Sequence, residues 1–203
     1  RAEEWDPDVA LYVVDHRQSE HFEKLFAAAR LWGYGEVDLR HVSFGTVLGE
    51  DGKPYKTRSG DTVGLEGLLD EAVRRAAAAI AENSERQEDA ADRLPPAEQQ
   101  TIANAVGHGA IKYADLSHNR TSDYVFSYDK MLALNGNTAT YLQYSYARVN
   151  GIFTRAGIDP AALGESPIRF TAEAERELGL RLLRFADALD EMLDDFRPNQ
   201  LTN

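Results

Sequence analysis

Residues 9–33 read VALYVVDHRQSEHFEKLFAAARLWG, and their pattern decides the fold. They open with a short apolar, β-branched run, which is typical of a strand covered on both faces. Apolar residues then recur on one helical face, with Ser19 placed to cap the helix and Gly33 to end it. A second strand is predicted around 37–48 and a second helix over 62–82. This strand–helix–strand–helix order predicts an α/β layer with a parallel sheet.

The rest of the chain is predicted to be helical after an acidic excursion at 82–100. The stretch 101–117, TIANAVGHGAIKYADLS, is interpreted as a helix, a glycine-rich break and a second apolar segment. Helices are then expected over 139–156 and in a final segment of about 25 residues, which should pair with each other because neither is stable alone. The last residues, RPNQLTN, are expected to add no packing element, and both chain ends are interpreted as truncations.

Composition limits the function classes. The chain has 203 residues, of which 43% are hydrophobic and 28% charged, as in a soluble globular protein. It holds no apolar run near the ~20 residues that would cross a membrane. It has no cysteine, which excludes disulfides and fits a reducing compartment. A net charge of −12 argues against nonspecific nucleic-acid binding but leaves room for a specific RNA partner.

The loop after the second predicted strand concentrates positive charge. It carries Lys53, Lys56 and Arg58 between glycines, after a strand and before a helix. Such a loop suits phosphate oxygens, because backbone amides and a helix N-terminus add to the positive potential of the side chains. It does not match the P-loop pattern GxxxxGK[ST], and a basic but merely solvated loop is the alternative.

Four stretches resemble one enzyme family and occur in its order: LYVVDHRQSEHF, LRHVSFGTVLGEDGKPYKTRSGDTV, AIKYADLSHNRTSDYVF and LNGNTATYLQYSYARV. They look like arginyl-tRNA synthetase, a class I aminoacyl-tRNA synthetase with a Rossmann-like catalytic domain. The similarity is strong from near residue 9 to near residue 155, and LLRFADALDEMLDDFRP fits more loosely. The resemblance implies an α/β plus all-α fold. Residues 1–136 would form the second half of the catalytic domain with the domain junction, and residues 137–203 the start of a helical anticodon-binding bundle.

The resemblance also implies a reaction. Family members join ATP, which carries Mg²⁺, and L-arginine into arginyl-adenylate and pass the arginyl group to tRNA(Arg). The basic loop matches the mobile KMSKS loop, whose cations stabilise charge on the leaving pyrophosphate. Thr57 stands where the general class I signature has its second lysine, so either Lys56 or Arg58 could act in its place. GHGA at 107–110 follows the loop and is therefore not the HIGH motif; without HIGH, the chain alone is expected to be inactive.

Substrate-site residues follow from the resemblance. Gln18 matches the family glutamine that contacts arginine, and its amide oxygen could accept from a guanidinium. His41 matches an ATP-site histidine, with the backbone near Gly45 and Val47 lining the adenine, where glycine allows close approach. The alternatives are a polar residue at a helix entry for Gln18 and a histidine satisfied within its strand for His41.

RNA contacts are expected from the helical part. Tyr141 and Tyr144 match tyrosines that meet the anticodon loop, where unstacked bases stack on aromatic rings. Core packing is the alternative, since most tyrosines at helical spacing serve it. The segment KYADLSHNRTSDY, with Lys112, His118 and Arg120, is expected to join the two domains, with RNA contact as a second role.

Other classes of protein are weighed against this one. The spacing of His16, His21 and His41 does not predict a metal site, and no protein-bound metal is expected. The expected location is the cytoplasm, away from membranes; the sequence does not determine the oligomeric state, and a monomer is the default. One alternative is a non-catalytic tRNA- or RNA-binding paralogue of a class I synthetase. Another is a nucleotidyl-transfer enzyme on the same scaffold with a different substrate.

Overall fold

The computed structural model describes residues 2–55, 64–86, 93–164 and 167–202. These residues form two compact units. The strand unit comprises Arg1–Tyr55 and His118–Phe126, and the helical unit comprises Lys56–Ser117 and Ser127–Asn203. The segment His118–Phe126 therefore leaves the helical unit after Ser117 and returns to it at Ser127.

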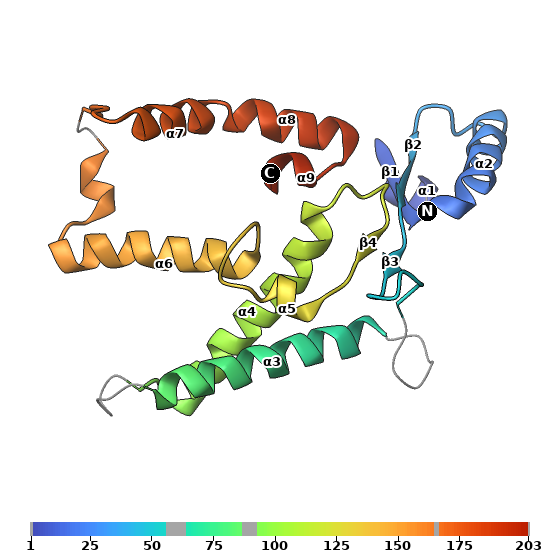
Figure 1. Cartoon of the computed structure of the whole chain (residues 1–203). Coiled ribbons are helices and arrows are strands. Elements are labelled where there is room, and N and C mark those ends of the chain that lie inside the picture. The colour runs from blue at the N-terminus through green and yellow to red at the C-terminus, as the bar shows by residue number, and fades with distance from the viewer. Residues whose placement is uncertain (1, 56–63, 87–92, 165–166, 203) are drawn as a thin grey trace. The chain divides into compact units, whose positions relative to one another are not determined.

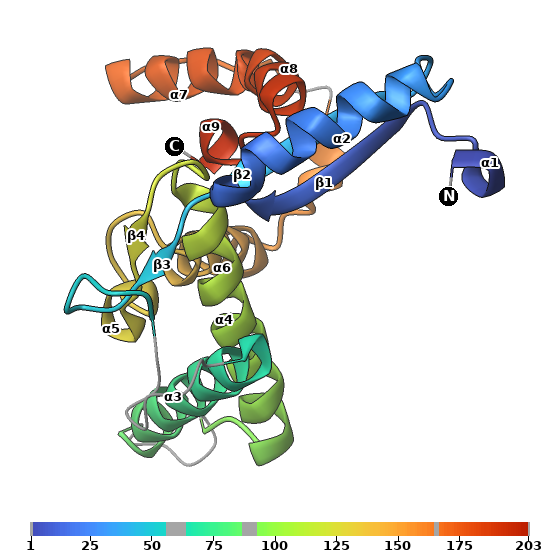
Figure 2. The ribbon, with the colours of Figure 1, turned by 90° about the vertical axis from the view of Figure 1, so that its right-hand side faces the viewer.

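The strand unit is built on two parallel strands, β1 (Val9–Asp15) and β2 (Asp38–Phe44), with Tyr12 opposite His41. Helix α2 (Ser19–Leu31) connects them and runs along the pair (Figures 1 and 2). Its Phe22 and Phe26 are buried, and each ring lies 5.3 Å from the ring of Tyr12. Apolar burial between one helix face and one sheet face thus forms the core of this unit. The predicted strand, helix and parallel pairing are confirmed.

Two details of that prediction are wrong. In the described residues α2 covers only one face of β1, and the side chains of the other face remain exposed: Val9, Leu11 and Val13. Ser19 is not the N-cap of α2 but its first residue, and its hydroxyl donates to the carbonyl of His16. The N-cap is Gln18. The helix does end before Gly33, whose φ of +105° is a conformation that favours glycine.

The second predicted strand is interrupted. After β2 the chain passes Gly45 and Thr46 and forms the short strand β3 (Val47–Leu48), which pairs in parallel with β4 (Tyr124–Val125). A Cβ on Gly45 would lie 2.5 Å from the carbonyl oxygen of Ser122, closer than any real contact. The glycine therefore lets two backbone segments meet where the strand breaks. Short segments complete the unit: α1 (Ala2–Trp5) and η1 (His16–Gln18).

The helical unit centres on α4 (Pro96–Ser117), which packs along α3 (Leu65–Glu85) (Figure 1). The predicted break within 101–117 is wrong, because α4 runs unbroken through both of its internal glycines. A Cβ on Gly107 would lie 2.6 Å from the backbone nitrogen of Val73 in α3. A Cβ on Gly109 would lie 2.9 Å from the side-chain nitrogen of Gln143. These glycines serve close packing rather than a turn.

The remaining helices follow in order. They are α5 (Tyr128–Met131), α6 (Ala139–Ala156), η3 (Pro160–Leu163), α7 (Glu173–Leu183), α8 (Phe185–Asp195) and α9 (Asn199–Thr202). The bounds of α6 agree with the sequence prediction. Its N-cap Thr138 accepts from the backbone of Tyr141 at 3.1 Å, and Gly157 ends it in the left-handed conformation.

The end of the chain differs from expectation in two ways. The single final helix is divided into α7 and α8 at Arg184. The last residues do form a packing element, since α9 contacts both α8 and α4. The hydroxyl of Tyr113 in α4 donates to the carbonyl of Thr202 at 2.9 Å. The expected pairing of the final helix with α6 is therefore wrong, because the main partner of α8 is α9. No helix among the described residues has the length and apolarity to cross a membrane.

Candidate functional site

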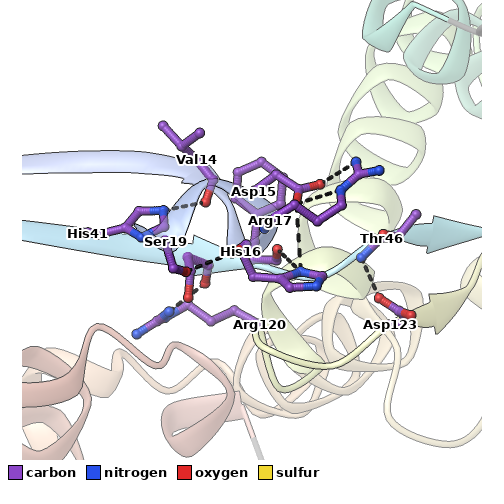
Figure 3. A network of polar contacts seen from close by, with 11 residues as sticks. Val14, Asp15, His16, Arg17, Ser19, His41, Thr46, Arg120 and Asp123 are labelled. Atoms are coloured by element: carbon purple, nitrogen blue, oxygen red, sulfur yellow. Dashed lines mark hydrogen bonds and ion pairs between the residues drawn. The ribbon is translucent and has the colours of Figure 1, made fainter. Parts of the chain in front are cut away.

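The carboxyl ends of β1 and β2 carry a network of polar contacts (Figure 3). Parallel strands end at one edge of a sheet, where doubly wound folds place their ligands. At this edge the carboxylate of Asp15 accepts from the Nε of Arg17 at 2.9 Å and from its Nη2 at 2.7 Å. The Arg17 hydrogen bonds hold the pKa of Asp15 well below its usual range. Asp15 is thus negatively charged and forms a bidentate salt bridge with Arg17.

Two histidines tie the strands together. The Nδ1 of His16 lies 3.2 Å from the carbonyl oxygen of Phe44, which links the turn after β1 to the end of β2. The Nε2 of His41 lies 3.0 Å from the carbonyl oxygen of Val14, and its ring stacks on Phe22 at 4.6 Å. His41 therefore has the contacts of a histidine satisfied within its sheet, and its role toward ATP stays a prediction. Within the described ranges no cluster of three His, Asp or Glu side chains could hold a metal ion.

Gln18 lies at the same edge, as the last residue of η1 directly before α2. It is the N-cap residue of α2, yet its side chain makes no capping hydrogen bond. The residue is exposed. Capping of α2 therefore does not occupy the side-chain amide oxygen of Gln18, which is the atom that could accept a hydrogen bond from a guanidinium.

The segment after β2 is held from one side by the junction segment His118–Phe126. The backbone N–H of Gly45 donates to the carbonyl of Arg120 at 2.7 Å. The N–H of Thr46 donates to Oδ1 of Asp123 at 2.6 Å. The guanidinium of Arg120 donates to the carbonyl of Ser43. Sequence reasoning missed Asp123, because a partner 77 residues away leaves no local pattern.

The base of the basic loop is closed by backbone contacts. The N–H of Tyr55 donates to the carbonyl of Val47 at 2.9 Å, and Leu48 forms an antiparallel bridge with Pro54. The ring of Tyr55 lies 4.9 Å from that of Phe126. Val47 is thus placed in a short strand directly beside the start of the loop.

The structure places one of the three predicted loop cations. The side chain of Lys53 is exposed. The backbone carbonyl of Lys53 accepts a hydrogen bond from the N–H of Gly49 at 2.7 Å, which closes a tight turn. Its own N–H donates to Oδ1 of Asp51 at 3.1 Å. Lys56 and Arg58 lie outside the described residues. The structure therefore brings Lys53, Val47 and Gly45 into one unit with Gln18 and His41.

The two predicted RNA-binding tyrosines belong to the helical unit. Tyr141 and Tyr144 lie on α6 and are 44% and 50% exposed, so neither is a core residue among the described residues. Gln143, between them, turns to α4 and donates to the carbonyl of Ala105 at 3.1 Å. Tyr146 is 75% exposed on the same helix, which helical periodicity alone did not single out. Gln143 thus adds a hydrogen bond to α4 beside the buried residues Ala139 and Thr140, and the rings of the three tyrosines stay exposed.

Residues 1–128 match the family "tRNA synthetases class I (R), catalytic domain", and residues 142–203 match the "DALR anticodon binding domain". The chain therefore belongs to the class I tRNA synthetases of the arginine type. The predicted fold, a class I catalytic domain followed by a helical anticodon-binding domain, is confirmed. The predicted boundary after residue 136 falls between the two matched regions.

Curated proteins that are similar to this chain include arginine–tRNA ligases. The chain is 51% identical to an arginine–tRNA ligase of Rhodopirellula baltica over 99% of its own length and 31% of the relative's. It is 48% identical to that of Laribacter hongkongensis, over 100% of its length and 34% of the relative's. The chain thus spans about a third of the length of the curated relatives it matches.

Solved structures show the same fold. The arginyl-tRNA synthetase of Plasmodium falciparum superposes with a TM-score of 0.75 at 31% identity, over 96% of this chain and 32% of that one. The arginyl-tRNA synthetase of Thermus thermophilus gives 0.73 at 28% identity, over 96% of this chain and 30% of that one.

Proposed function

We propose that this chain is part of an arginine–tRNA ligase, which forms arginyl-adenylate from ATP and L-arginine and passes the arginyl group to tRNA(Arg). The observation that carries the proposal is the order of the two family matches along a chain with arginine–tRNA ligase relatives. The absence of cysteine and the family's role in protein synthesis support a cytoplasmic location. A non-catalytic RNA-binding paralogue is not favoured, because the named relatives are ligases.

Nucleotide chemistry is assigned to the carboxyl edge of the sheet and the loop beside it. His41 and the backbone of Gly45 and Val47 would bind ATP. The cations Lys53, Lys56 and Arg58 would stabilise negative charge as pyrophosphate leaves. Mg²⁺ would enter with ATP, supply further positive charge at the phosphates and be held mainly by them. The chain's own contribution is then to place cations, which needs no covalent step on the protein.

The proposed arginine contact is Gln18. Its exposed amide, unused by the helix that it caps, could accept a hydrogen bond from the substrate guanidinium. The neighbouring Asp15 is already paired with Arg17, so it does not offer a free carboxylate there. Gln18 could therefore start α2 with its backbone and contact the substrate with its side chain.

Replacing Gln18 by leucine in the full-length ligase is expected to raise KM for arginine about tenfold, since one hydrogen bond to a charged group is lost. KM for ATP should change by less than about twofold, because nucleotide groups are untouched. ATP–pyrophosphate exchange with each substrate varied in turn measures both. Equal KM values for arginine in the two proteins would return Gln18 to a helix-entry role.

The proposed tRNA contacts are Tyr141 and Tyr144, whose half-exposed rings could stack on unpaired bases. The chain's net charge of −12 does not oppose this, because stacking depends on the ring and not on overall charge.

Tyr141→Ala in the full-length ligase is expected to weaken tRNA(Arg) binding by about 1–3 kcal/mol if the ring stacks a base. Filter binding or calorimetry with the tRNA transcript measures the loss. The control is Tyr34→Ala, a tyrosine of the strand unit remote in sequence from α6, which should leave tRNA affinity unchanged. An unchanged affinity for the Tyr141 variant would show that this ring has no RNA role.

Residues 1–203 alone are expected to form no arginyl-adenylate, because a site assembled from several parts loses most of its rate when parts are missing. Arginine-dependent ATP–pyrophosphate exchange by this chain, measured beside the full-length ligase, tests the expectation. Exchange above the no-arginine background would contradict it.

A further inference from the structure

The strand unit holds two charged side chains that the proposed reaction does not use. Asp123 and Arg120 both come from the junction segment His118–Phe126, and both bind main-chain groups of 43–46 (Figure 3). Neither has a part in the proposed arginine or ATP contacts. In these two hydrogen bonds the partners are backbone atoms, so the bonds bear on the path of the chain between β2 and β3.

The hydrogen bonds from this segment cover most of the stretch 43–48. Arg120 contributes its guanidinium to Ser43 and its carbonyl to the N–H of Gly45. Two ladder bonds then run from Tyr124 N–H to Thr46 at 3.2 Å and from Phe126 N–H to Leu48 at 2.8 Å. The Thr46 N–H lies between the Gly45 bond and the first ladder bond, and no backbone group of the described residues accepts from it.

Asp123 fills that gap. Its Oδ1 accepts from the Thr46 N–H at 2.6 Å, one residue after the glycine that allows the two backbones to meet. A backbone N–H without an acceptor is costly, and a carboxylate is a stronger acceptor than a neutral group. Without Asp123 the turn at Thr46 would lose the one side-chain acceptor that the described residues provide for this N–H.

We infer that Asp123 is a positioning residue for nucleotide binding and that Arg120 assists it. The inference rests on the proposed ATP site, in which the backbone of Gly45 and Val47 lines the adenine. Asp123 binds the N–H of the residue between these two. A backbone surface recognises a purine through its shape and its N–H and C=O groups, so a small displacement of Thr46 weakens the contact.

The experiment uses the full-length ligase and compares Asp123→Ala with Asp123→Asn. The asparagine amide keeps an oxygen that can accept from Thr46, whereas alanine does not. Dissociation constants for ATP are measured by calorimetry without arginine or tRNA, and KM and kcat by ATP–pyrophosphate exchange. Glu36→Ala is the matched control, since it removes one exposed carboxylate from the same unit.

Asp123→Ala is expected to raise the dissociation constant and KM for ATP about tenfold, the effect of losing one hydrogen bond to a charged group. KM for arginine and kcat should stay within about twofold, as should all constants of the control. Asp123→Asn keeps a neutral acceptor and should therefore raise KM for ATP clearly less than alanine does. A merely structural role would instead lower kcat through loss of active protein and leave KM for ATP unchanged.

Three results would overturn the inference. The first is an unchanged ATP affinity in Asp123→Ala while the wild type still catalyses arginine-dependent ATP–pyrophosphate exchange. This result refutes the positioning role and leaves the ligase function standing. The second is an Asp123→Asn defect as large as that of alanine, which assigns the effect to charge. The third is a wild type that binds no ATP, which removes the proposed function as well. If Asp123→Ala does not fold, Arg120→Met carries the test: it removes the bond to Ser43 and should also raise KM for ATP.

Discussion

Replacing Lys56 and Arg58 together by alanine in the full-length ligase is expected to lower kcat for ATP–pyrophosphate exchange by about 10²–10³-fold, the usual effect of removing charge stabilisation from a transition state. Negative charge grows on the leaving pyrophosphate, and cations that bind it there act on the rate more than on substrate binding. KM for arginine should change little. The single variants then decide which cation stands in for the missing lysine at Thr57.

The matched control for the loop is a pair of cations on α2. Lys24 and Arg30 are exposed in the strand unit, and Lys24 pairs only with Glu20 of its own helix among the described residues. Their double alanine variant removes the same charge from another surface and should keep kcat. If the kcat of the loop variant for ATP–pyrophosphate exchange lies within about tenfold of the wild-type value, these cations do not stabilise the transition state.

Gly107→Val is expected to destabilise the helical unit by about 3 kcal/mol, the upper end of the cost of overpacking. The Cβ that valine adds would lie 2.6 Å from the backbone nitrogen of Val73. Backbone atoms of α3 cannot move aside as a flexible side chain could, so the two helices must separate. Urea unfolding, followed by the loss of helical circular dichroism, measures the cost.

Gly151→Val is the control for that experiment. Gly151 also lies inside a helix, α6, but a Cβ there meets nothing within 4 Å. Valine and glycine differ by only a few tenths of a kcal/mol in helix propensity, so stability should stay within about 0.5 kcal/mol of wild type. If both variants lose equal stability, the close approach of α3 and α4 is not what requires Gly107.

Local patterns predicted most of the elements. The apolar run at 9–15 predicted a strand and the helical face from Phe22 to Phe26 predicted a packing surface, and both are found, although the strand is covered on one face only among the described residues. The helix at 139–156 was predicted with the bounds that the structure gives it, from residues that recur at three- and four-residue spacing, and its cap and terminal glycine are also local signals. Such signals need only neighbours in sequence.

Tertiary contacts explain the errors. In the sequence the glycines of α4 look like a break. Gly107 is instead required by the close approach of Val73 in α3, which lies more than thirty residues earlier in the chain. The packing of α9 on α4 depends on Tyr113 meeting Thr202, 89 residues apart. Propensity cannot report such pairs, because it contains no information about which distant segments meet.

The same limit applies to the site. The resemblance named Gln18, His41, Gly45 and Val47, and the structure places them in the strand unit with Lys53. What no sequence pattern indicated is that the stretch carrying Gly45 and Val47 is held by Arg120 and Asp123 of the junction segment. That segment is continuous in the chain with α4 on one side and α5 on the other, so it connects the proposed nucleotide site to the helical unit.

The measurement that tests the central claim most directly is aminoacylation with amino acid as the variable. The full-length protein is incubated with ATP, total tRNA and each of the twenty labelled amino acids in turn, and label on tRNA is counted. Label from arginine alone is the predicted result. Label from a different amino acid would keep the fold and contradict the specificity, and no label from any, by a protein that still binds tRNA, would contradict the ligase function itself.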